Sequence, residues 1–205
     1  MWIIYSLNIN KATGPSSIPG KILELLKYSI CEPLSTLINL SFTTGVFPSA
    51  LKIAKVTPVF KNKGSPLICS NYRPISLLSN IDKIYEKIIY KRLHAFLTHH
   101  NILFPQQFGF RKSYSTLHAV LSISQKLYNA LDSGKFAYAV FIDLEKAFDT
   151  VDHKILLSKL NHYGIRGTTL NLLKSYLSDR FQFVSLSGAD SSTSPIKHGV
   201  LKGLS

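Results

Sequence analysis

Apolar residues recur at helical spacing in two long stretches of the chain. Between residues 80 and 97, apolar side chains stand three and four positions apart, and three lysines fall on another face. Residues 115–131 repeat this pattern, which is typical of amphipathic surface helices. Further helices are expected where proline or glycine marks a start or a stop, namely at residues 20–30, 33–45, 153–163 and 168–178.

Other stretches favour β-strands. Residues 52–60 are rich in β-branched and aromatic side chains but contain Pro58, which predicts an edge strand because proline cannot donate to a ladder. Residues 61–66 form a loop. Residues 137–144 are nearly all apolar, which indicates a strand buried on both faces. A further strand is predicted at 181–186, so the pattern as a whole is that of an α+β protein in which helices dominate.

The charge is strongly basic and unevenly placed. The 205 residues carry 24 Lys and Arg against 11 Asp and Glu, a net charge of +13. Residues 52–112 hold eleven of the basic residues and two acids, whereas four of the eleven acids lie within residues 143–152. Polyanions, with nucleic acid first among them, are the expected partners of the basic region, and the acidic region is a candidate cation site.

Neither export nor a membrane span is expected from the sequence. Cys31 and Cys69 form no CxxC pair and have no zinc-ligand spacing, which favours a reduced, intracellular protein. Residues 1–5 are apolar, but they lack a preceding basic region and are too few for the apolar part of a signal peptide. Even the apolar run at residues 137–142 is far shorter than the ~20 residues that cross a bilayer.

Asp143 is the strongest candidate for chemistry. It follows the apolar residues 139–142 at the expected carboxyl end of a strand, with Glu145, Asp149 and Asp152 close behind. This arrangement suits a divalent cation held over a substrate. The simpler interpretation is that these acids cap the turn and the following helix. We favour capping for Asp152 and cation binding for Asp143, because an uncompensated buried charge costs several kcal/mol.

Four segments together resemble the reverse transcriptases of non-LTR (LINE-type) retrotransposons, especially the jockey and CR1 groups. The resemblance runs from about Lys11 to the last residue. The segments that carry it are NYRPISLL (71–78), QFGFRK (107–112), AVFIDL with AFDTVDH (139–144 and 147–153) and YGIRG (163–167).

The resemblance implies a right-hand polymerase fold with an incomplete palm sheet. Residues 1–136 would form an N-terminal extension and the fingers. Residues 137–205 would form part of the palm, with the first catalytic strand, two helices and the start of the next motif. The implied activity is RNA-directed DNA polymerisation, a nucleotidyl transfer with two Mg²⁺ ions, in which RNA template, DNA primer and deoxynucleoside triphosphates are the partners.

The resemblance also assigns roles to individual residues. Asp143 would be the first catalytic aspartate and would bind Mg²⁺ together with the Leu144 carbonyl. Phe148 would be the steric gate that rejects a 2′-hydroxyl, and Arg73 and Arg111 would approach the triphosphate, as charge neutralisation in phosphoryl transfer requires. The remaining expected contacts are Lys202 and Gly203 to the nucleotide, and Lys61, Lys63 and Lys112 to the template backbone.

The chain departs from the family pattern near its last residues. Where the family has Gly-Val-Pro-Gln-Gly-Ser, this chain reads Gly199-Val200-Leu201-Lys202-Gly203. The family's second catalytic motif contains an Asp-Asp pair, and no such pair occurs in the 205 residues. We therefore expect a truncated element copy that is inactive as an isolated chain, in the nucleus or the cytoplasm. Without the missing hairpin, the strand at 137–144 would also lack a neighbour and expose apolar surface.

Two other functions fit parts of the sequence. A non-catalytic nucleic-acid-binding remnant of a retroelement would keep the basic region and have no need of magnesium. A metal nuclease of the integrase type would need carboxylates that converge on one site from separate parts of the sequence. Asp143, Asp149 and Asp152 lie too close together in the sequence to meet this requirement.

Overall fold

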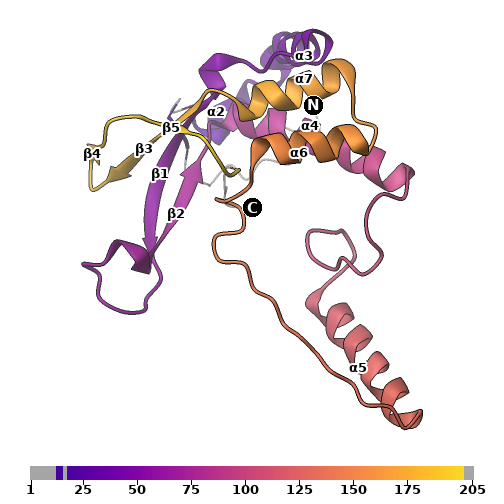
Figure 1. Ribbon diagram of the computed structural model, residues 1–205. Coiled ribbons are helices and arrows are strands. Elements are labelled where there is room, and N and C mark those ends of the chain that lie inside the picture. The colour runs from indigo at the N-terminus through magenta and orange to yellow at the C-terminus, as the bar shows by residue number, and fades with distance from the viewer. Residues whose placement is uncertain (1–12, 16–17, 201–205) are drawn as a thin grey trace. The chain divides into compact units, whose positions relative to one another are not determined.

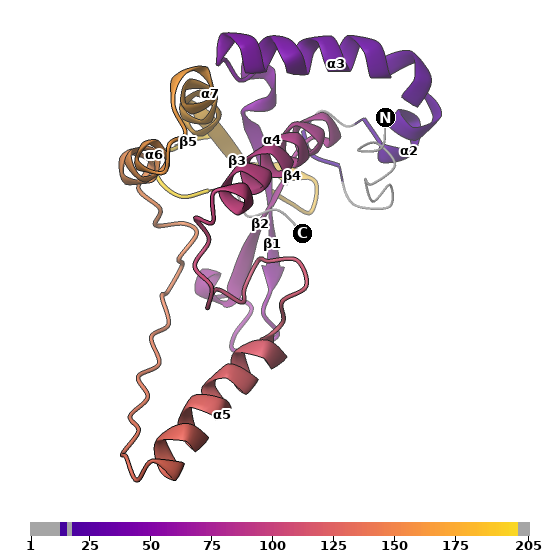
Figure 2. The same cartoon turned by 90° about the vertical axis from the view of Figure 1, so that its right-hand side faces the viewer.

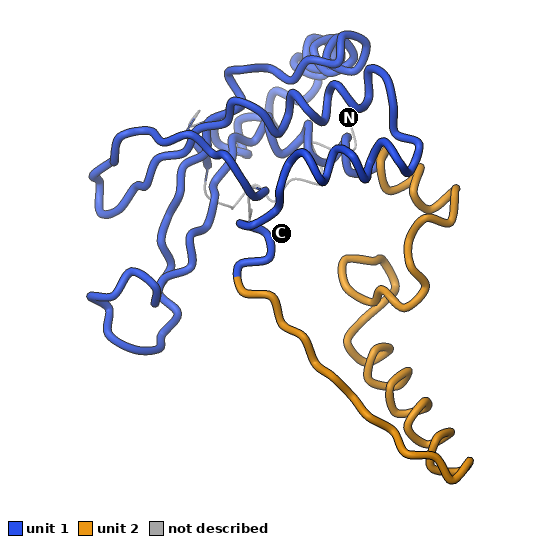
Figure 3. Tube along the Cα trace, viewed as in Figure 1, with its two compact units in different colours: residues 1–91, 146–205 blue, residues 92–145 orange. Residues whose placement is uncertain are grey.

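The computed structural model describes residues 13–15 and 18–200. The chain divides into two compact units, residues 1–91 with 146–205 and residues 92–145 (Figure 3). The second unit is therefore an insertion in the sequence of the first. The boundary at residues 91 and 92 falls inside one long helix, α4 (Asn80–His99).

The described part of the first unit contains a mixed sheet (Figure 1). Its central strand β1 (Ile53–Phe60) lies between β2 (Tyr72–Leu77) and β3 (Arg180–Leu186). The short strands β4 (Ala189–Asp190) and β5 (Ser194–Ile196) both pair with β3. Because β1 is antiparallel to β2 and parallel to β3, the sheet joins segments that are far apart in the sequence.

Residues 52–60 were predicted to form an edge strand, but β1 has β2 on one side and β3 on the other. Its second half, which contains Pro58, pairs with β2 alone. β1 pairs with β3 only over Ile53–Val56, whereas its pairing with β2 continues to Phe60. Pro58 faces Pro74 of β2, beyond the end of the β3 pairing. The missing N–H of Pro58 thus falls where β1 has one neighbour, as a strand proline requires. The sequence pattern did not predict strand β2.

The predicted helices are confirmed with small changes in their bounds. The first two, α2 (Gly20–Leu25) and α3 (Lys27–Thr44), are separated at Leu26, and Pro33 lies inside α3 and not at its start. The carbonyl that Pro33 leaves without a helical partner belongs to Ser29, on the exposed side of the helix. The later helices are α5 (Thr116–Asp132), α6 (His153–His162) and α7 (Gly167–Leu177). Within the described ranges, no helix has the length and apolar content that crossing a bilayer needs.

The core of the first unit lies where α2, α3, α4 and α7 meet beside the sheet (Figure 2). Phe47 is its centre, 1% exposed. The Phe47 ring meets Tyr85 of α4 and Tyr176 of α7 edge to face, with ring centroids 5.4 Å and 5.1 Å away. Such edge-to-face contacts add to the gain from burial. The buried residues of this cluster are Leu23, Leu34, Ile38, Phe47, Ile84, Tyr85 and Leu172.

A buried polar network crosses this core. Arg180, at the start of β3, forms an ion pair with Asp82 in the first turn of α4. The Arg180 guanidinium also donates to the carbonyls of Tyr176 and Leu51 and lies over the Tyr176 ring. The Tyr176 hydroxyl in turn donates to Glu86. These contacts fix α4, α7 and β3 to one another.

The described residues of the second unit contain the last part of α4, a loop and α5. Helix α5 begins in a capping box, because the Ser115 N–H donates to His118 Nδ1 over 3.1 Å. No residue of α5 is buried. Its exposed apolar residues include Leu117, Val120, Leu121, Tyr128 and Leu131.

The prediction of a buried strand at residues 137–144 is wrong. These residues have no regular secondary structure, and every one of them is exposed. A strand needs a neighbour for its backbone groups, and none pairs with this segment in the described part of the chain. The exposure agrees with the expectation that apolar surface would be left uncovered here.

Candidate nucleotide-binding site

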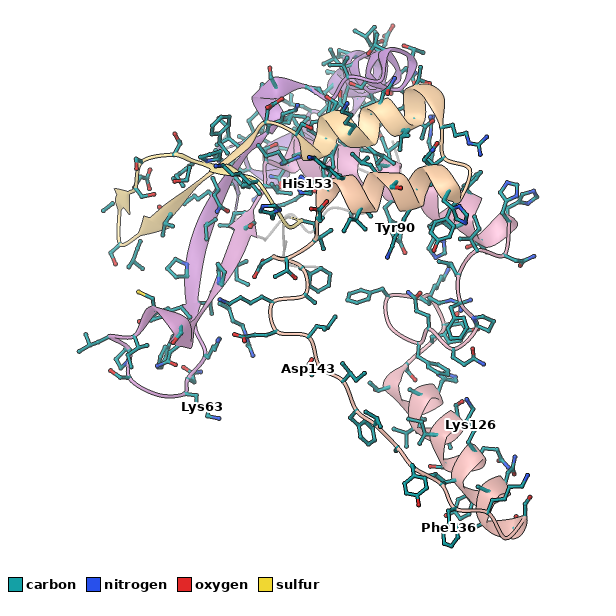
Figure 4. All side chains as sticks on the ribbon, viewed as in Figure 1. Lys63, Tyr90, Lys126, Phe136, Asp143 and His153 are labelled. Carbon is teal, nitrogen blue, oxygen red and sulfur yellow. The ribbon has the colours of Figure 1, made fainter. Side chains whose placement is uncertain are left out.

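Asp143 and Leu144 lie in the second unit, in the extended segment that follows α5 (Figure 4). Both residues are exposed, so Asp143 is not drawn into hydrophobic packing. The carboxylate therefore carries no burial penalty, and solvent or a cation can reach it. The placement leaves Asp143 available as a ligand.

The described residues do not make up a magnesium site by themselves. Nowhere in residues 13–15 and 18–200 do three or more His, Cys, Asp or Glu side chains lie close enough to bind one ion. Mg²⁺ prefers six oxygens in octahedral geometry, and two-ion sites need carboxylates from separate places. Asp143 and the Leu144 carbonyl are only a part of such a ligand set.

Phe148 belongs to the first unit. There its backbone is hydrogen-bonded to the segment that begins at Gly199, where the next family motif starts. The Val200 N–H donates to the Phe148 carbonyl over 2.9 Å, and the Gly199 N–H donates to the Val151 carbonyl over 2.8 Å. His153 Nε2 lies 2.7 Å from the Gly199 carbonyl oxygen. Two motifs that stand about fifty residues apart in the sequence therefore meet.

Only glycine fits at position 199, both because of its backbone conformation and because no space is left for a side chain. Its φ is +83°, and a Cβ atom there would lie 2.7 Å from the Asp149 carbonyl oxygen and 2.8 Å from the Asp149 Cα. No side chain fits at such distances unless the backbone moves. Lys202 and Gly203, which we expected at the nucleotide, lie outside the described residues.

Asp152 is a helix cap, as predicted. Its Oδ1 accepts from the Ile155 N–H at the start of α6 over 3.0 Å. This hydrogen bond is the main reason why the pKa of Asp152 is lowered. The cap also fixes His153 at the first position of α6, from which it reaches Gly199.

Arg73 and two of the lysines belong to the β1–β2 hairpin of the first unit. Arg73 is exposed on β2, opposite Val59 of β1. Lys61 Nζ donates to the Ser70 carbonyl over 2.7 Å, which helps to close the loop between the strands. Lys63 is exposed in that loop (Figure 4). These three cations lie on the hairpin, and Lys61 also has a structural contact.

Arg111 and Lys112 belong to the loop before α5 in the second unit. The guanidinium of Arg111 donates to the Phe104 carbonyl over 3.0 Å and lies over the Tyr114 ring, 4.3 Å from its centroid. Stacking of this kind holds the side chain in place while other N–H groups stay available. Lys112 is exposed.

Sequence reasoning missed two contributors to this site, His153 and Gly199. His153 ends the AFDTVDH segment that carries the family resemblance, and Gly199 begins the segment in which the chain departs from the family pattern. No local pattern in the sequence singles them out, because their contact joins residues 46 positions apart and depends on the fold of the whole unit. Their role here is to position the backbone around Phe148.

Comparison with known proteins agrees with the motifs. Residues 60–205 match the family described as "Reverse transcriptase (RNA-dependent DNA polymerase)". The probable RNA-directed DNA polymerase from transposon BS of Drosophila melanogaster is 32% identical over 98% of this chain and 22% of its own length. The same figures hold for the RNA-directed DNA polymerase from mobile element jockey of that species.

More distant relatives match as well. The Pol polyprotein from the type-1 retrotransposable element R2 of Popillia japonica is 30% identical over 65% of this chain and 18% of its own length. The chain spans about a fifth of the length of the first curated relatives it matches. Its fold and its motifs thus agree with a family match over most of the chain, and the chain belongs to the reverse transcriptase (RNA-dependent DNA polymerase) family.

Proposed function

We propose that this chain supplies the fingers and the first part of the palm of an RNA-directed DNA polymerase of a non-LTR retrotransposon. The observation that supports this best is the junction between Phe148 and Val200, which brings the motif after Asp143 to the beginning of the next family motif. Residues 1–136 are then the N-terminal extension and fingers, and 137–205 the partial palm. The protein would work inside the cell, in the nucleus or the cytoplasm.

Each site residue has a role in this function. Asp143 and the Leu144 carbonyl supply ligands for Mg²⁺, which neutralises charge on the triphosphate when it is bound. Arg73 and Arg111 bind phosphate oxygens, because planar guanidinium groups match them in pairs. Phe148 lies under the sugar and excludes a 2′-hydroxyl by its bulk.

The contacts to the remaining substrates follow the charge. Lys202 and Gly203 approach the nucleotide. The exposed Lys61, Lys63 and Lys112 bind the phosphates of the RNA template and DNA primer, which is a sequence-independent contact. Lysine at position 202 cannot replace the paired donor and acceptor of the family's glutamine, so nucleotide selection should be weaker than in the relatives.

A chimera tests this function. Residues 60–205 are exchanged into the polymerase of the jockey element in place of the matching segment, and primer extension on an RNA template is measured. We expect template-dependent product that Asp143→Ala abolishes and that Leu201→Pro with Lys202→Gln increases. Phe148→Ala should raise ribonucleotide incorporation. Product that persists after Asp143→Ala would refute the assigned role.

The 205 residues alone should not extend a primer, because a single aspartate cannot hold two ions. The same purified chain separates the polymerase fragment from the alternative, a nucleic-acid-binding remnant. Binding of a nucleotide that depends on Mg²⁺ and is abolished in Asp143→Ala supports the fragment. Binding of RNA that depends on salt and ignores Mg²⁺, with no nucleotide bound, supports the remnant.

A further inference from the structure

The side chain of His153 connects two segments that are far apart in the sequence. Its Nε2 atom lies 2.7 Å from the Gly199 carbonyl oxygen, 46 positions further along the chain. A carbonyl oxygen accepts hydrogen bonds and cannot donate them, so Nε2 carries a proton in this contact. His153 is therefore the donor, and the Gly199 carbonyl is its acceptor.

The peptide group between Gly199 and Val200 is held at both of its ends. Its C=O accepts from His153, and its N–H donates to the Phe148 carbonyl over 2.9 Å. The C=O and the N–H of a trans peptide group point in opposite directions, so the two partners lie on opposite sides of it. Together these hydrogen bonds determine how the peptide plane is oriented.

The backbone conformation alone does not fix this peptide group. Gly199 has a φ of +83°, and glycine can rotate about its backbone bonds at little steric cost because it has no Cβ atom. The Gly199 N–H donates to the Val151 carbonyl over 2.8 Å, but it belongs to the preceding peptide group. Without His153, the Gly199 C=O would lose the partner that it has in the described part of the chain.

His153 is well placed to hold this peptide group because it begins a helix. The Asp152 side chain accepts from the Ile155 N–H over 3.0 Å and so fixes the first turn of α6. Figure 4 shows His153 at this end of α6, where the residue is partly buried. A side chain on a capped helix loses little further freedom when it makes a contact. The helix therefore presents a preorganised donor to Gly199.

We propose that His153 is a positioning residue for nucleotide selection. By fixing the 199–200 peptide group against the Phe148 carbonyl, it sets the spacing between Phe148, the expected steric gate, and the expected nucleotide contacts Lys202 and Gly203. This inference rests on the proposed function and adds to it a residue that touches neither the nucleotide nor the metal.

The expected effect is on selection and not on the chemical step. A steric gate rejects a 2′-hydroxyl only if the sugar cannot move away from the aromatic ring, so the groups that line the nucleotide on its other side must stay in place. Small displacements of such groups change binding and discrimination. Rotation of the 199–200 peptide group would therefore relax discrimination and weaken nucleotide binding, whereas Asp143 would keep its role.

Two substitutions separate the hydrogen bond from the bulk of the side chain. His153→Gln keeps a donor, because the amide nitrogen of glutamine is as many bonds from Cβ as Nε2 of histidine is. His153→Leu keeps comparable bulk and removes the donor, and both new residues favour helices. His162→Leu is the matched control, since His162 is the exposed last residue of the same helix and its ring contacts Tyr163.

Hydrogen exchange of the purified 205-residue chain tests the contact itself. His153→Leu should reduce the protection of the Val200 amide roughly three- to tenfold, which corresponds to the loss of one hydrogen bond, while the amides of α7 keep theirs. His153→Gln should restore most of this protection, and His162→Leu should leave it unchanged. Unchanged protection of Val200 in His153→Leu overturns the proposal. An equal loss throughout α7 also overturns it, because His153 would then only stabilise the unit.

The chimera with the jockey polymerase tests the selective role. The values of kcat and KM are measured for a deoxynucleotide and for the matching ribonucleotide. His153→Leu should raise KM for the deoxynucleotide, leave its kcat nearly unchanged, and lower the ratio of the two kcat/KM values roughly three- to tenfold. His153→Gln should recover most of this ratio. A fall in kcat by the same factor for both nucleotides, with the ratio unchanged, contradicts the proposal.

The double variant His153→Leu/Phe148→Ala tests whether His153 acts through Phe148. If it does, the two losses of discrimination do not multiply, because the gate is already absent. Losses that multiply contradict the proposal. If Phe148→Ala alone leaves discrimination unchanged, or if the unsubstituted chimera is inactive, the proposed function is refuted and the selective role of His153 with it. Exchange at Val200 then still decides whether His153 holds the 199–200 peptide group.

Discussion

Arg180 Nη2 lies 3.1 Å from Asp82 Oδ2, and both side chains are almost completely buried, 3% and 1% exposed. The pair joins β3 to α4 across 98 residues of sequence. Among the described residues, the other carboxylate oxygen of Asp82 and Nε of Arg180 have no hydrogen-bond partner. The ion pair is therefore the main compensation for the buried charge of Asp82, whereas Arg180 also donates to two backbone carbonyls.

Removal of one partner should destabilise the first unit strongly. Arg180→Met leaves the Asp82 carboxylate buried without a counter-charge, which costs about 3 to 5 kcal/mol. We expect this loss at pH 8, where Asp82 of the folded protein is ionised beside Arg180, and a smaller loss at pH 5, where burial keeps Asp82 of the folded protein protonated. Urea unfolding followed by circular dichroism measures it. The double variant Asp82→Leu/Arg180→Met should recover much of the loss, and equal instability of both variants would contradict the explanation by charge.

The same network predicts an unusual pH dependence of stability. Burial raises the pKa of Asp82 to about 7, against the opposing attraction of Arg180. Burial also raises the pKa of Glu86, although its hydrogen bond from Tyr176 acts in the other direction. The native state therefore binds more protons than the unfolded chain above pH 4, and the free energy of unfolding falls as the pH rises toward 7.

The slope should be about 1.4 kcal/mol per pH unit for each carboxyl group that differs in this way. Asp82→Asn removes the titration of that group, so the urea midpoint of this variant should change less between pH 5 and pH 7. Because the two proteins differ at one position only, the comparison isolates residue 82. If the urea midpoint changed with pH in the same way in both proteins, Asp82 would have its ordinary pKa.

Two glycines with the same backbone conformation should respond differently to alanine. Gly199 and Gly188 have φ values of +83° and +84°, but a Cβ atom meets the Asp149 backbone at Gly199 and nothing within 4 Å at Gly188. Gly188→Ala should cost about 1 kcal/mol from conformation alone. Gly199→Ala should cost clearly more and should abolish the hydrogen-exchange protection of the Val200 amide. Equal effects of both substitutions would argue against the junction at Phe148.

Binding of single-stranded RNA should depend on salt through the predicted phosphate contacts. Replacement of Lys61, Lys63 and Lys112 by Gln should reduce the slope of log affinity against log salt by about 0.7 for each lysine that binds a phosphate. The matched control replaces Lys126, Lys154 and Lys174, which are also exposed, and changes the net charge by the same amount. A control that lowers the slope equally would show that only net charge matters.

Local patterns in the sequence were sufficient for most of the helices. The apolar spacing at 80–97 predicted α4, and the spacing at 115–131 predicted α5, because helical hydrogen bonds close within four residues. The Asp152 cap was also predictable, since donor and acceptor lie three residues apart. Features that a short stretch of chain determines by itself were thus accessible from the sequence.

Features that depend on contacts between distant parts of the sequence could not be predicted from local patterns. Residues 52–60 form a central strand because β3, more than a hundred residues later in the sequence, supplies a parallel neighbour. Residues 137–144 have the composition of a strand but no neighbour among the described residues. The same applies to the site, where the motifs identified Phe148 but the hydrogen bond of its carbonyl to Val200 depends on how the unit folds.

The parallel pairing of β1 with β3 has a consequence for synthesis of the protein. The register from Ile53 opposite Phe181 to Val56 opposite Val184 cannot form until the ribosome has made β3. Until then β1 has only β2 beside it, and the whole of residues 92–145 must emerge first. Nascent chains should therefore remain accessible to chaperones until β3 has emerged, because contacts of such high sequence separation form slowly.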